Sequence, residues 1–407
     1  MASAQSYFIS FSGTGESSSV NTVLVQNLTT GSALLTLNGT DILHLIGPNG
    51  ISSLENTPSS KLLIYPNPMT DNSILQVIPP VSGDATITAY NMLGKPVAQI
   101  TYYFENNLQE FRLSGINHGL YLINVKGRNY QFSGKLLSNN QRTGPIKIEK
   151  INNNPTAESK KTIKSDNKGE LVTIDMDYNT GDRLIFTGMS GNYKTVKTDI
   201  PTSSKTITFD FISCTDEDAN NYGVVQIGTQ TWMAENLKTT KYNEGSTIPL
   251  VTDETEWNNL VTPGYCWYNN DEFAFKSTYG AIYNWYVVNT GILCPKNWHV
   301  PTDVEWTILT TYMGGESVAG GKLKDAGTWF WNSPNTGATN EAGFTALPGG
   351  DRFYTGTFAN IHSASYWWSI NESGSNAIGR LIRSATIDVE KVYILKKTGW
   401  SVRCLKN

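Results

Sequence analysis

Hydrophobic and polar residues alternate with a period of two along much of the first 213 residues. Such alternation predicts strands that bury one face, and the Gly, Ser and Asn residues between the runs predict turns. The clearest runs lie at 7–11, 22–25, 34–37, 42–45, 171–174, 183–186 and 206–211. We therefore predict all-β modules in this part of the chain, with His44 as a packing residue on a strand rather than a ligand.

A helical pattern appears at 294–315. Thr302 and Glu305 have the spacing of a capping box, and apolar residues at 304, 308, 309 and 312 follow at helical spacing. Gly314 and Gly315 can adopt the left-handed conformation that ends a helix. The stretch predicts a capped helix that anchors a core. We interpret His299, just before it, as a hydrogen-bonding residue of that core rather than a catalytic base.

The aromatic and sulfur content changes at residue 214. All four cysteines and all eleven tryptophans occur from that position onward. The length of 407 residues also exceeds what one hydrophobic core usually organises. We therefore place a domain boundary here, with a distinct C-terminal domain at 214–407.

Four motifs between residues 61 and 140 occur in a recognisable order: IYPNP at 64–68, AYNMLGK at 89–95, LSGINHGLY at 113–121 and GKLL at 134–137. The region resembles the C-terminal sorting domain of the type IX secretion system of Bacteroidetes. This resemblance implies a small seven-stranded β-sandwich and a secreted protein. A sorting domain of that kind ends its polypeptide, whereas residues 141–407 follow here. We interpret the region as a structural sandwich retained inside a larger surface protein, and leave its part in export open.

Two shorter β-rich stretches, 5–60 and 141–213, flank the sorting-like region. Either they are the halves of one discontinuous sandwich with the sorting-like region inserted, or they are separate modules. The lysine-rich segment at 156–169 is interrupted by acidic residues, so we interpret it as a solvated loop.

A second ordered set of motifs fills 214–407: VVQIGTQTW at 224–232, YCWYN at 265–269, YGAIYNW at 279–285, WHVPTDVEW at 298–306, GFTALPGG at 343–350, YWWS at 366–369 and SVRC at 401–404. This segment resembles the Fibrobacter succinogenes major paralogous domain. It is also similar to the formylglycine-generating-enzyme branch of the C-type lectin fold. The fold class that follows is multidomain, with all-β sandwich modules N-terminal and an α+β C-type-lectin-like domain C-terminal.

The four cysteines are Cys214, Cys266, Cys294 and Cys404, an even count that fits two disulfides in an exported chain. Formylglycine-generating enzymes use two reactive cysteines a few residues apart, whereas Cys404 has no such neighbour. We therefore do not expect their copper-dependent activity. Folds of this kind commonly tie the helix to the final strand, which implies a Cys294–Cys404 disulfide and leaves Cys214 and Cys266 as a second pair.

Composition and charge favour a location outside the cell. Charged residues make up only 16%, and the net charge of −4 gives no reason to expect a nucleic-acid partner. A low charge content with abundant Gly, Ser, Thr and Asn is usual in secreted β-rich proteins. No stretch has the length of a transmembrane helix, and Ala2-Ser3-Ala4 resembles the end of a secretory signal.

Candidate ligand-binding residues lie in loops after the predicted helix, where aromatic rings can stack on sugars and polar side chains can bind hydroxyl groups. We select Trp329, Trp331, Asp351, Tyr354, Phe358 and Trp368. Two oxygen-rich runs, with Asn269 and Asp271 in one and Asn340 and Glu341 in the other, are weaker candidates for a structural calcium ion. A turn is the favoured interpretation of both, and we expect no other cofactor.

We expect a secreted or cell-surface protein that recognises a glycan or a surface protein without catalysis, as in adhesion. The alternative is a structural subunit that self-assembles into a surface fibre. An enzyme acting on extracellular glycans or peptides is a third hypothesis. It requires two convergent carboxylates or an activated nucleophile, and the sequence reveals neither.

Overall fold

The computed structural model describes residues 6–31, 34–47, 62–65, 69, 72–77, 79, 81–92, 94–105, 109–128, 130–138, 140, 146–150 and 172–407. The predicted signal end at 2–4, the motif residues 66–68 and 93, and the lysine-rich segment at 156–169 lie outside these ranges. The chain forms two compact units. Unit 1 comprises residues 1–11, 33–180 and 201–207, and unit 2 comprises 12–32, 181–200 and 208–407.

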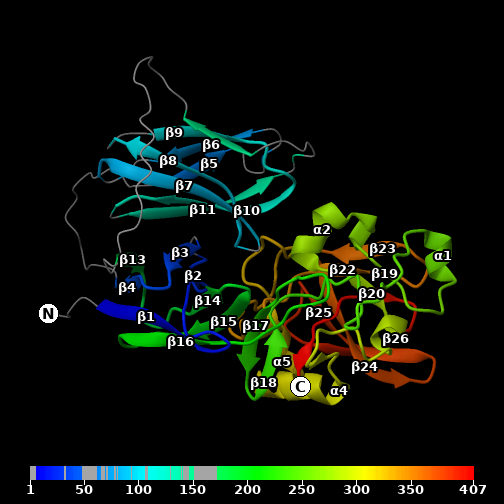
Figure 1. Cartoon of the computed structure of the whole chain (residues 1–407). Coiled ribbons are helices and arrows are strands. Elements are labelled where there is room, and N and C mark those ends of the chain that lie inside the picture. The colour runs from blue at the N-terminus through cyan, green and yellow to red at the C-terminus, as the bar shows by residue number, and fades with distance from the viewer. Residues whose placement is uncertain are drawn as a thin grey trace. The chain divides into compact units, whose positions relative to one another are not determined.

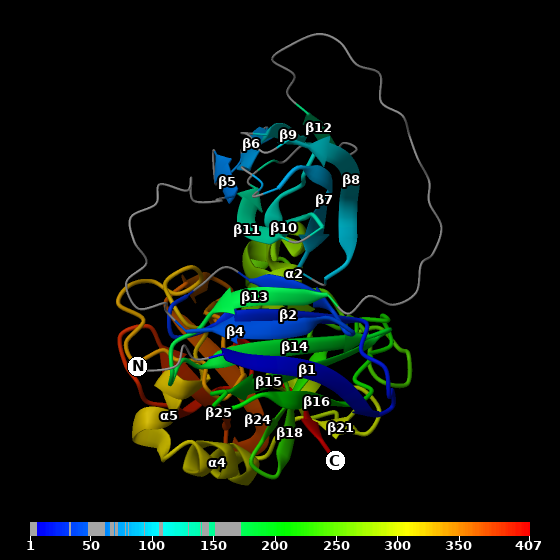
Figure 2. The same ribbon diagram turned by 90° about the vertical axis from the view of Figure 1, so that its left-hand side faces the viewer.

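Unit 1 contains a β-sandwich whose two sheets are visible in Figures 1 and 2. One sheet has the order β11-β10-β7-β8 and the other β12-β9-β6-β5. Their inner faces bury Ile87, Phe111 and Ile123 in one core. The strands are β5 (Leu62–Tyr65), β6 (Asn72–Val77), β7 (Gly83–Asn91), β8 (Pro96–Phe104), β9 (Gln109–Ser114), β10 (Gly119–Lys126), β11 (Gln131–Ser138) and β12 (Lys147–Lys150). Within the described residues this is one strand more than the resemblance implies, because β12 lies beyond residue 140.

A further sheet of unit 1 has the order β13-β4-β1-β16. Its strands are β13 (Thr173–Asp177), β4 (Ile42–Ile46), residues 6–11 of β1 (Ser6–Gly15) and residues 205–207 of β16 (Lys205–Phe211). Alternation buries Ile9, Leu43 and Leu45 completely on one face. His44 belongs to the other face, where it lies opposite Phe8 of β1 and Asp175 of β13. Unit 1 also includes β3 (Leu35–Asn38).

The large sheet of unit 2 contains strands in the order β21-β28-β18-β17-β15-β14-β2. Their bounds are β2 (Thr22–Asn27), β14 (Leu184–Ser190), β15 (Tyr193–Asp199), β17 (Gly223–Ile227), β18 (Gln230–Met233), β21 (Trp298–His299) and β28 (Leu405–Lys406). Strands β15 and β17 are parallel, and their last paired residues are Val196 and Val225. Both strands continue beyond this pair, so the sheet opens between them.

Two smaller sheets and the helices complete unit 2. The sheets have the orders β19-β20-β27-β22-β23 and β24-β25-β26. Their strands are β19 (Tyr265–Cys266), β20 (Ile282–Asn284), β22 (Gly349–Arg352), β23 (Phe358–Ile361), β24 (Ala364–Ser373), β25 (Asn376–Arg383), β26 (Glu390–Leu395) and β27 (Gly399–Trp400). The helices are α1 (Glu254–Asn258), η1 (Tyr268–Asn270), α2 (Glu272–Tyr279), α3 (Trp285–Val288), α4 (Asp303–Tyr312) and α5 (Glu316–Leu323). Helices α4 and α5 lie side by side (Figure 2).

The aromatic residues of unit 2 form its core. Trp306 of α4 is fully buried, and its ring lies 4.8 Å from that of Trp232, centroid to centroid. Phe344 and Trp367 pack around the same pair. The helix therefore anchors a core, as its sequence predicts. Strands predominate throughout the described residues, which fits a multidomain, β-rich protein. None of the helices in the described ranges is long and apolar enough to cross a lipid bilayer.

The structure contains the Cys294–Cys404 disulfide that the resemblance implies, with an S–S distance of 1.99 Å. It links the segment before α4 to the final strands. Cys214 and Cys266 are free thiols, so the prediction of a second pair was wrong. The reason is spatial, because the two side chains are buried in different hydrophobic clusters. Burial raises the pKa of the Cys266 thiol to about 12, which keeps that thiol protonated and unreactive.

Candidate binding site

Helix α4 begins where the sequence predicts. The Thr302 hydroxyl accepts from the Glu305 amide at 3.2 Å, and the Glu305 carboxylate accepts from the Thr302 amide at 2.7 Å. This is the predicted capping box. His299 lies beside it, with Nε2 3.0 Å from the Glu305 carboxylate and Nδ1 2.6 Å from the Asn407 side chain. His299 therefore makes hydrogen bonds at the start of the helix, as predicted, but its side chain is 34% exposed and is not part of the core.

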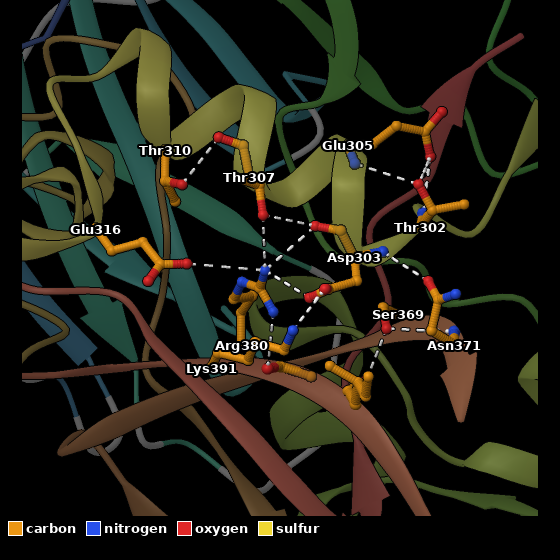
Figure 3. Close-up of polar contacts among 12 residues, drawn as sticks. Thr302, Asp303, Glu305, Thr307, Thr310, Glu316, Ser369, Asn371, Arg380 and Lys391 are labelled. Atoms are coloured by element: carbon orange, nitrogen blue, oxygen red, sulfur yellow. Dashed lines mark hydrogen bonds and ion pairs between the residues drawn. The ribbon is translucent and has the colours of Figure 1, made fainter. Parts of the chain in front are cut away.

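A buried arginine holds the first turn of α4 against the β24-β25-β26 sheet (Figure 3). The Arg380 guanidinium is fully buried and lies 2.7 Å from the Asp303 carboxylate, which also accepts from Lys391 at 2.6 Å. Burial acts to raise the pKa of Asp303, but hydrogen bonds and charge from Lys391 and Arg380 outweigh it and lower that pKa. Figure 3 also shows Glu316 facing Arg380, at 3.9 Å. We conclude that this cluster positions the helix.

The structure separates the six predicted ligand-binding residues into two groups. Trp329 and Tyr354 are exposed, at 44% and 40%. Trp331 and Trp368 are buried, at 1% and 0%, so their assignment to a binding surface was wrong. Each is a core ring with a satisfied indole: Trp331 donates to the Ala346 carbonyl at 2.9 Å and Trp368 to the Tyr283 carbonyl at 2.8 Å.

The other two predicted binding residues, Phe358 and Asp351, pack against other parts of unit 2. Phe358 is half-buried against Tyr268 and the Arg352 guanidinium. Asp351 is only 3% exposed and accepts from the Asn360 side chain at 2.9 Å, so its assignment to an open binding loop was wrong. Burial raises the pKa of Asp351 to about 6.

The four residues considered for calcium have local structural contacts. Asp271 caps α2 by accepting from the Ala274 amide, and Asn269 has a positive φ of 51° in the preceding turn. Asn340 is buried and accepts from the Thr345 amide, while Glu341 pairs with Lys322 at 3.2 Å. Across the described ranges, no group of three or more His, Cys, Asp or Glu side chains gathers in a way that could hold a metal ion.

A cleft of about 680 Å³ opens in unit 2 where β15 and β17 diverge. Its lining includes Val196, Val225 and Ile227 of the sheet and Tyr312 and Met313 at the end of α4. The remaining lining residues are Arg183, Thr195, Lys197, Thr198, Asp210, Ile212, Val224, Gln226, Gly228, Thr231, Lys322, Glu341 and Ala342. The cleft lies where the pairing of β15 and β17 ends, because the residues of both strands beyond Val196 and Val225 line it.

Tyr312 provides an exposed aromatic wall of the cleft, at 66% exposure. Its ring rests on the β17–β18 turn at Gly228, where a Cβ atom would lie 2.9 Å from the ring. Gly228 also has a φ of 61°, a conformation that favours glycine. Glycine at this position therefore lets the ring lie close to the turn.

Charged groups form another part of the lining. The Glu341 carboxylate is shared by Lys322 at 3.2 Å and Arg183 at 3.9 Å, and the Thr198 hydroxyl donates to the Glu341 carbonyl at 2.6 Å. All three charged side chains are partly exposed, between 27% and 36%. A guanidinium has five N–H donors, so one distant carboxylate leaves donors of Arg183 available to a ligand. The cleft thus combines an aromatic surface with charged hydrogen-bonding groups.

The sequence does not reveal this cleft. Strand β15 was absent from the predicted runs because it reads YKTVKTD, with one large apolar residue at Val196. Its Thr195 is nevertheless buried, with the hydroxyl donating to the Asp210 carbonyl at 2.8 Å. Tyr312 and Gly228 lay within recognised motifs, but their contact depends on the tertiary fold.

Comparison with known protein families identifies two regions of the chain. Residues 225–406 match the family model of the Fibrobacter succinogenes major domain, and residues 63–139 match that of the secretion system C-terminal sorting domain. Both resemblances inferred from the motifs are confirmed. No curated protein and no solved structure matches the chain. The sorting-domain match indicates a secreted protein attached to the cell surface. Part of the cleft, from Arg183 to Val224, precedes the first matched region.

Proposed function

We propose that this secreted, cell-surface protein serves in recognition or adhesion and binds a glycan, without catalysis at that site, through the cleft of unit 2. The observation that carries the proposal is the presence of Tyr312, Arg183 and Lys322 at one cleft of about 680 Å³. A C-type-lectin-like fold for the C-terminal domain belongs to the same proposal. The Cys294–Cys404 disulfide, which links the segment before α4 to the final strands, supports this fold.

The chemistry of the cleft suits a sugar. The C–H face of a pyranose ring packs on an exposed aromatic ring, and Tyr312 offers such a ring. Sugar hydroxyl groups donate to carboxylates and accept from cationic groups, and the Arg183–Glu341–Lys322 cluster offers both. A volume of about 680 Å³ lies within the range of pockets that hold small molecules. One or two sugar residues therefore fit.

A glycan array tests this proposal with the full chain. We expect the wild type to bind a defined subset of glycans, and Tyr312→Ala to bind them about tenfold more weakly, as loss of about 1.4 kcal/mol of stacking implies. Tyr393→Ala is the matched control, because Tyr393 is also exposed, at 52%, but lies on β26 outside the cleft. Binding that is absent in the wild type, or unchanged in Tyr312→Ala, would contradict the proposal.

The loop aromatics provide an internal comparison. Trp329→Ala and Tyr354→Ala remove the two exposed residues of the set predicted from the sequence. If the cleft is the site, neither substitution changes glycan binding by more than about twofold. Loss of binding in Trp329→Ala with normal binding in Tyr312→Ala would place recognition on the loops instead.

A further inference from the structure

The open face of the unit 1 sheet brings together three residues that are far apart in the sequence. Ser6 lies on β1, His44 on β4 and Asp175 on β13. His44 is directly opposite Asp175 in the parallel β4–β13 pair and opposite Phe8 in the antiparallel β1–β4 pair. Ser6 is two residues from Phe8, so it belongs to the same face. The three side chains therefore lie on one face of neighbouring strands.

Their polar atoms form a continuous chain of hydrogen bonds. The Ser6 Oγ atom is 2.7 Å from His44 Nε2, and His44 Nδ1 is 2.9 Å from Asp175 Oδ1. An ionised carboxylate accepts hydrogen bonds and cannot donate them, so the Nδ1 atom carries the proton. A neutral imidazole then has Nε2 free to accept, and Ser6 must donate its O–H. The nucleophile, base and orienting acid are thus in the order that activates a serine.

The imidazole is also held in orientation by an aromatic ring. Phe8 stacks on His44 with a centroid distance of 4.4 Å and an interplanar angle of 5°. Phe8 itself is 46% exposed, and the His44 side chain is 21% exposed. The ring fixes the plane of the imidazole, and its exposed part offers an apolar surface on the sheet face that carries Ser6.

We propose that Ser6, His44 and Asp175 form an acyl-transfer site that hydrolyses carboxylic esters. The Ser6 oxygen attacks the acyl carbon while His44 Nε2 takes the hydroxyl proton. The ester C–O bond then breaks, and the alcohol leaves with that proton. A water molecule releases the acyl group by the reverse sequence, with His44 first accepting a proton from the water and then returning one to Ser6. Water is the only co-reactant, so atoms and charge balance.

The position of the site indicates the kind of ester. Ser6 and Asp175 are exposed on an open sheet face, with Asp175 at 67%. Such a face can meet an ester carried on the surface of a polymer, and the Phe8 ring can contact a small acyl group. The substrate class is therefore small acyl esters on macromolecules at the cell surface. This activity is independent of the proposed recognition cleft, and it supplies the activated nucleophile that the sequence did not reveal.

The same strand provides a matched control. Ser10 points to the same face of β1 as Ser6, but its hydroxyl is 2.7 Å from the Thr206 hydroxyl rather than from an imidazole. Ser6→Ala and Ser10→Ala each remove one hydroxyl group from this face. Only Ser6→Ala removes a hydroxyl that a base can activate.

The experiment uses the full chain, p-nitrophenyl acetate as substrate and a fluorophosphonate as covalent probe. We expect the probe to label Ser6, as located by peptide mass spectrometry, and the wild type and Ser10→Ala to hydrolyse the ester equally. Ser6→Ala, His44→Gln and Asp175→Asn should each lower the rate above background by about 100-fold or more, the usual contribution of general base catalysis. Absence of labelling, labelling at another serine, or equal rates in Ser6→Ala and the wild type would overturn the proposal.

Discussion

Asp351 offers a direct test of how burial controls the stability of unit 2. It lies on β22, is 3% exposed, and accepts a hydrogen bond from the Asn360 side chain at 2.9 Å. Burial penalises its charged form and raises the pKa of Asp351 from 3.8 to about 6. The folded protein therefore holds this proton more tightly than the unfolded chain does.

The sign and size of the effect follow from proton linkage. Between pH 3.8 and about 6 the folded state binds more protons at Asp351 than the unfolded state, so this residue lowers the free energy of unfolding as the pH rises. The full penalty is present above pH 6. A difference of about two pKa units corresponds to about 3 kcal/mol, with about 2 kcal/mol of it appearing between pH 4.5 and 7.5. Asp351→Asn cannot ionise and does not contribute this pH dependence.

Urea unfolding at pH 4.5 and 7.5, followed by tryptophan fluorescence, measures the effect. All eleven tryptophans occur from residue 214 onward, so the signal reports on unit 2. We expect the stability of Asp351→Asn relative to wild type to increase by about 2 kcal/mol from pH 4.5 to 7.5. Asn360→Ala removes the hydrogen bond to the carboxylate and should make the pH dependence steeper. A constant difference between Asp351→Asn and wild type would refute the reasoning.

Other predictions concern the thiols, the tryptophans and the Glu235 carboxylate. When the chain is denatured without reductant, a disulfide-exchange reagent should detect two thiols, and detection of four would contradict the disulfide. The double substitution Cys294→Ser and Cys404→Ser should lower the free energy of unfolding by about 4 kcal/mol, because the disulfide closes a long loop. Trp331→Ala should cost about 3–5 kcal/mol in urea unfolding, whereas Trp329→Ala should stay within about 0.5 kcal/mol. Two lysine ammonium groups outweigh the effect of burial and lower the pKa of Glu235, so its stabilising contribution is lost in acid. Glu235→Gln should therefore be less stable than wild type at pH 7, with the gap closing as the pH falls.

The sequence predicted best those features that depend on local spacing. The capping box of α4 involves residues three apart, and the glycines that follow have φ values of 102° and 104°. Most of the alternating runs before residue 214 coincide with strands. Both family resemblances rest on motifs of four to nine adjacent residues, and both are confirmed. In each case the physical cause lies within one element or between elements adjacent in the sequence.

The sequence could not show which side of a ring faces solvent. Trp329 and Trp331 are two residues apart in the same loop, yet one is 44% exposed and the other 1%. The difference arises because Trp331 reaches the Ala346 carbonyl and packs near the Lys324 ammonium. Asp351 was likewise chosen as a loop residue, whereas it belongs to β22 and points into the interior.

Long-range pairing explains the rest of what the sequence did not predict. His44 was interpreted as a packing residue because it lies within an apolar strand. Its actual partners, Ser6 and Asp175, are 38 and 131 residues away in the sequence. The register of three strands decides that contact, and register cannot be assigned from alternation alone when strands are this far apart.

The first turn of helix α4 contacts the Arg380 and Lys391 side chains through Asp303, and its last turn contributes Tyr312 to the cleft. Asp303 and Tyr312 are its two ends, about 14 Å apart along the helix axis because nine steps of 1.5 Å separate them. Arg380→Met should lower stability by about 1.5–3 kcal/mol, because the Asp303 carboxylate loses one charged hydrogen-bond partner but keeps Lys391 at 2.6 Å. Because Arg380 does not line the cleft, the protein that remains folded should keep its glycan affinity, whereas Tyr312→Ala should lose affinity without losing stability. Measurement of urea unfolding and glycan binding in both variants checks this separation. Equal loss of affinity in the two would show that the Asp303–Arg380 pair and the cleft are coupled.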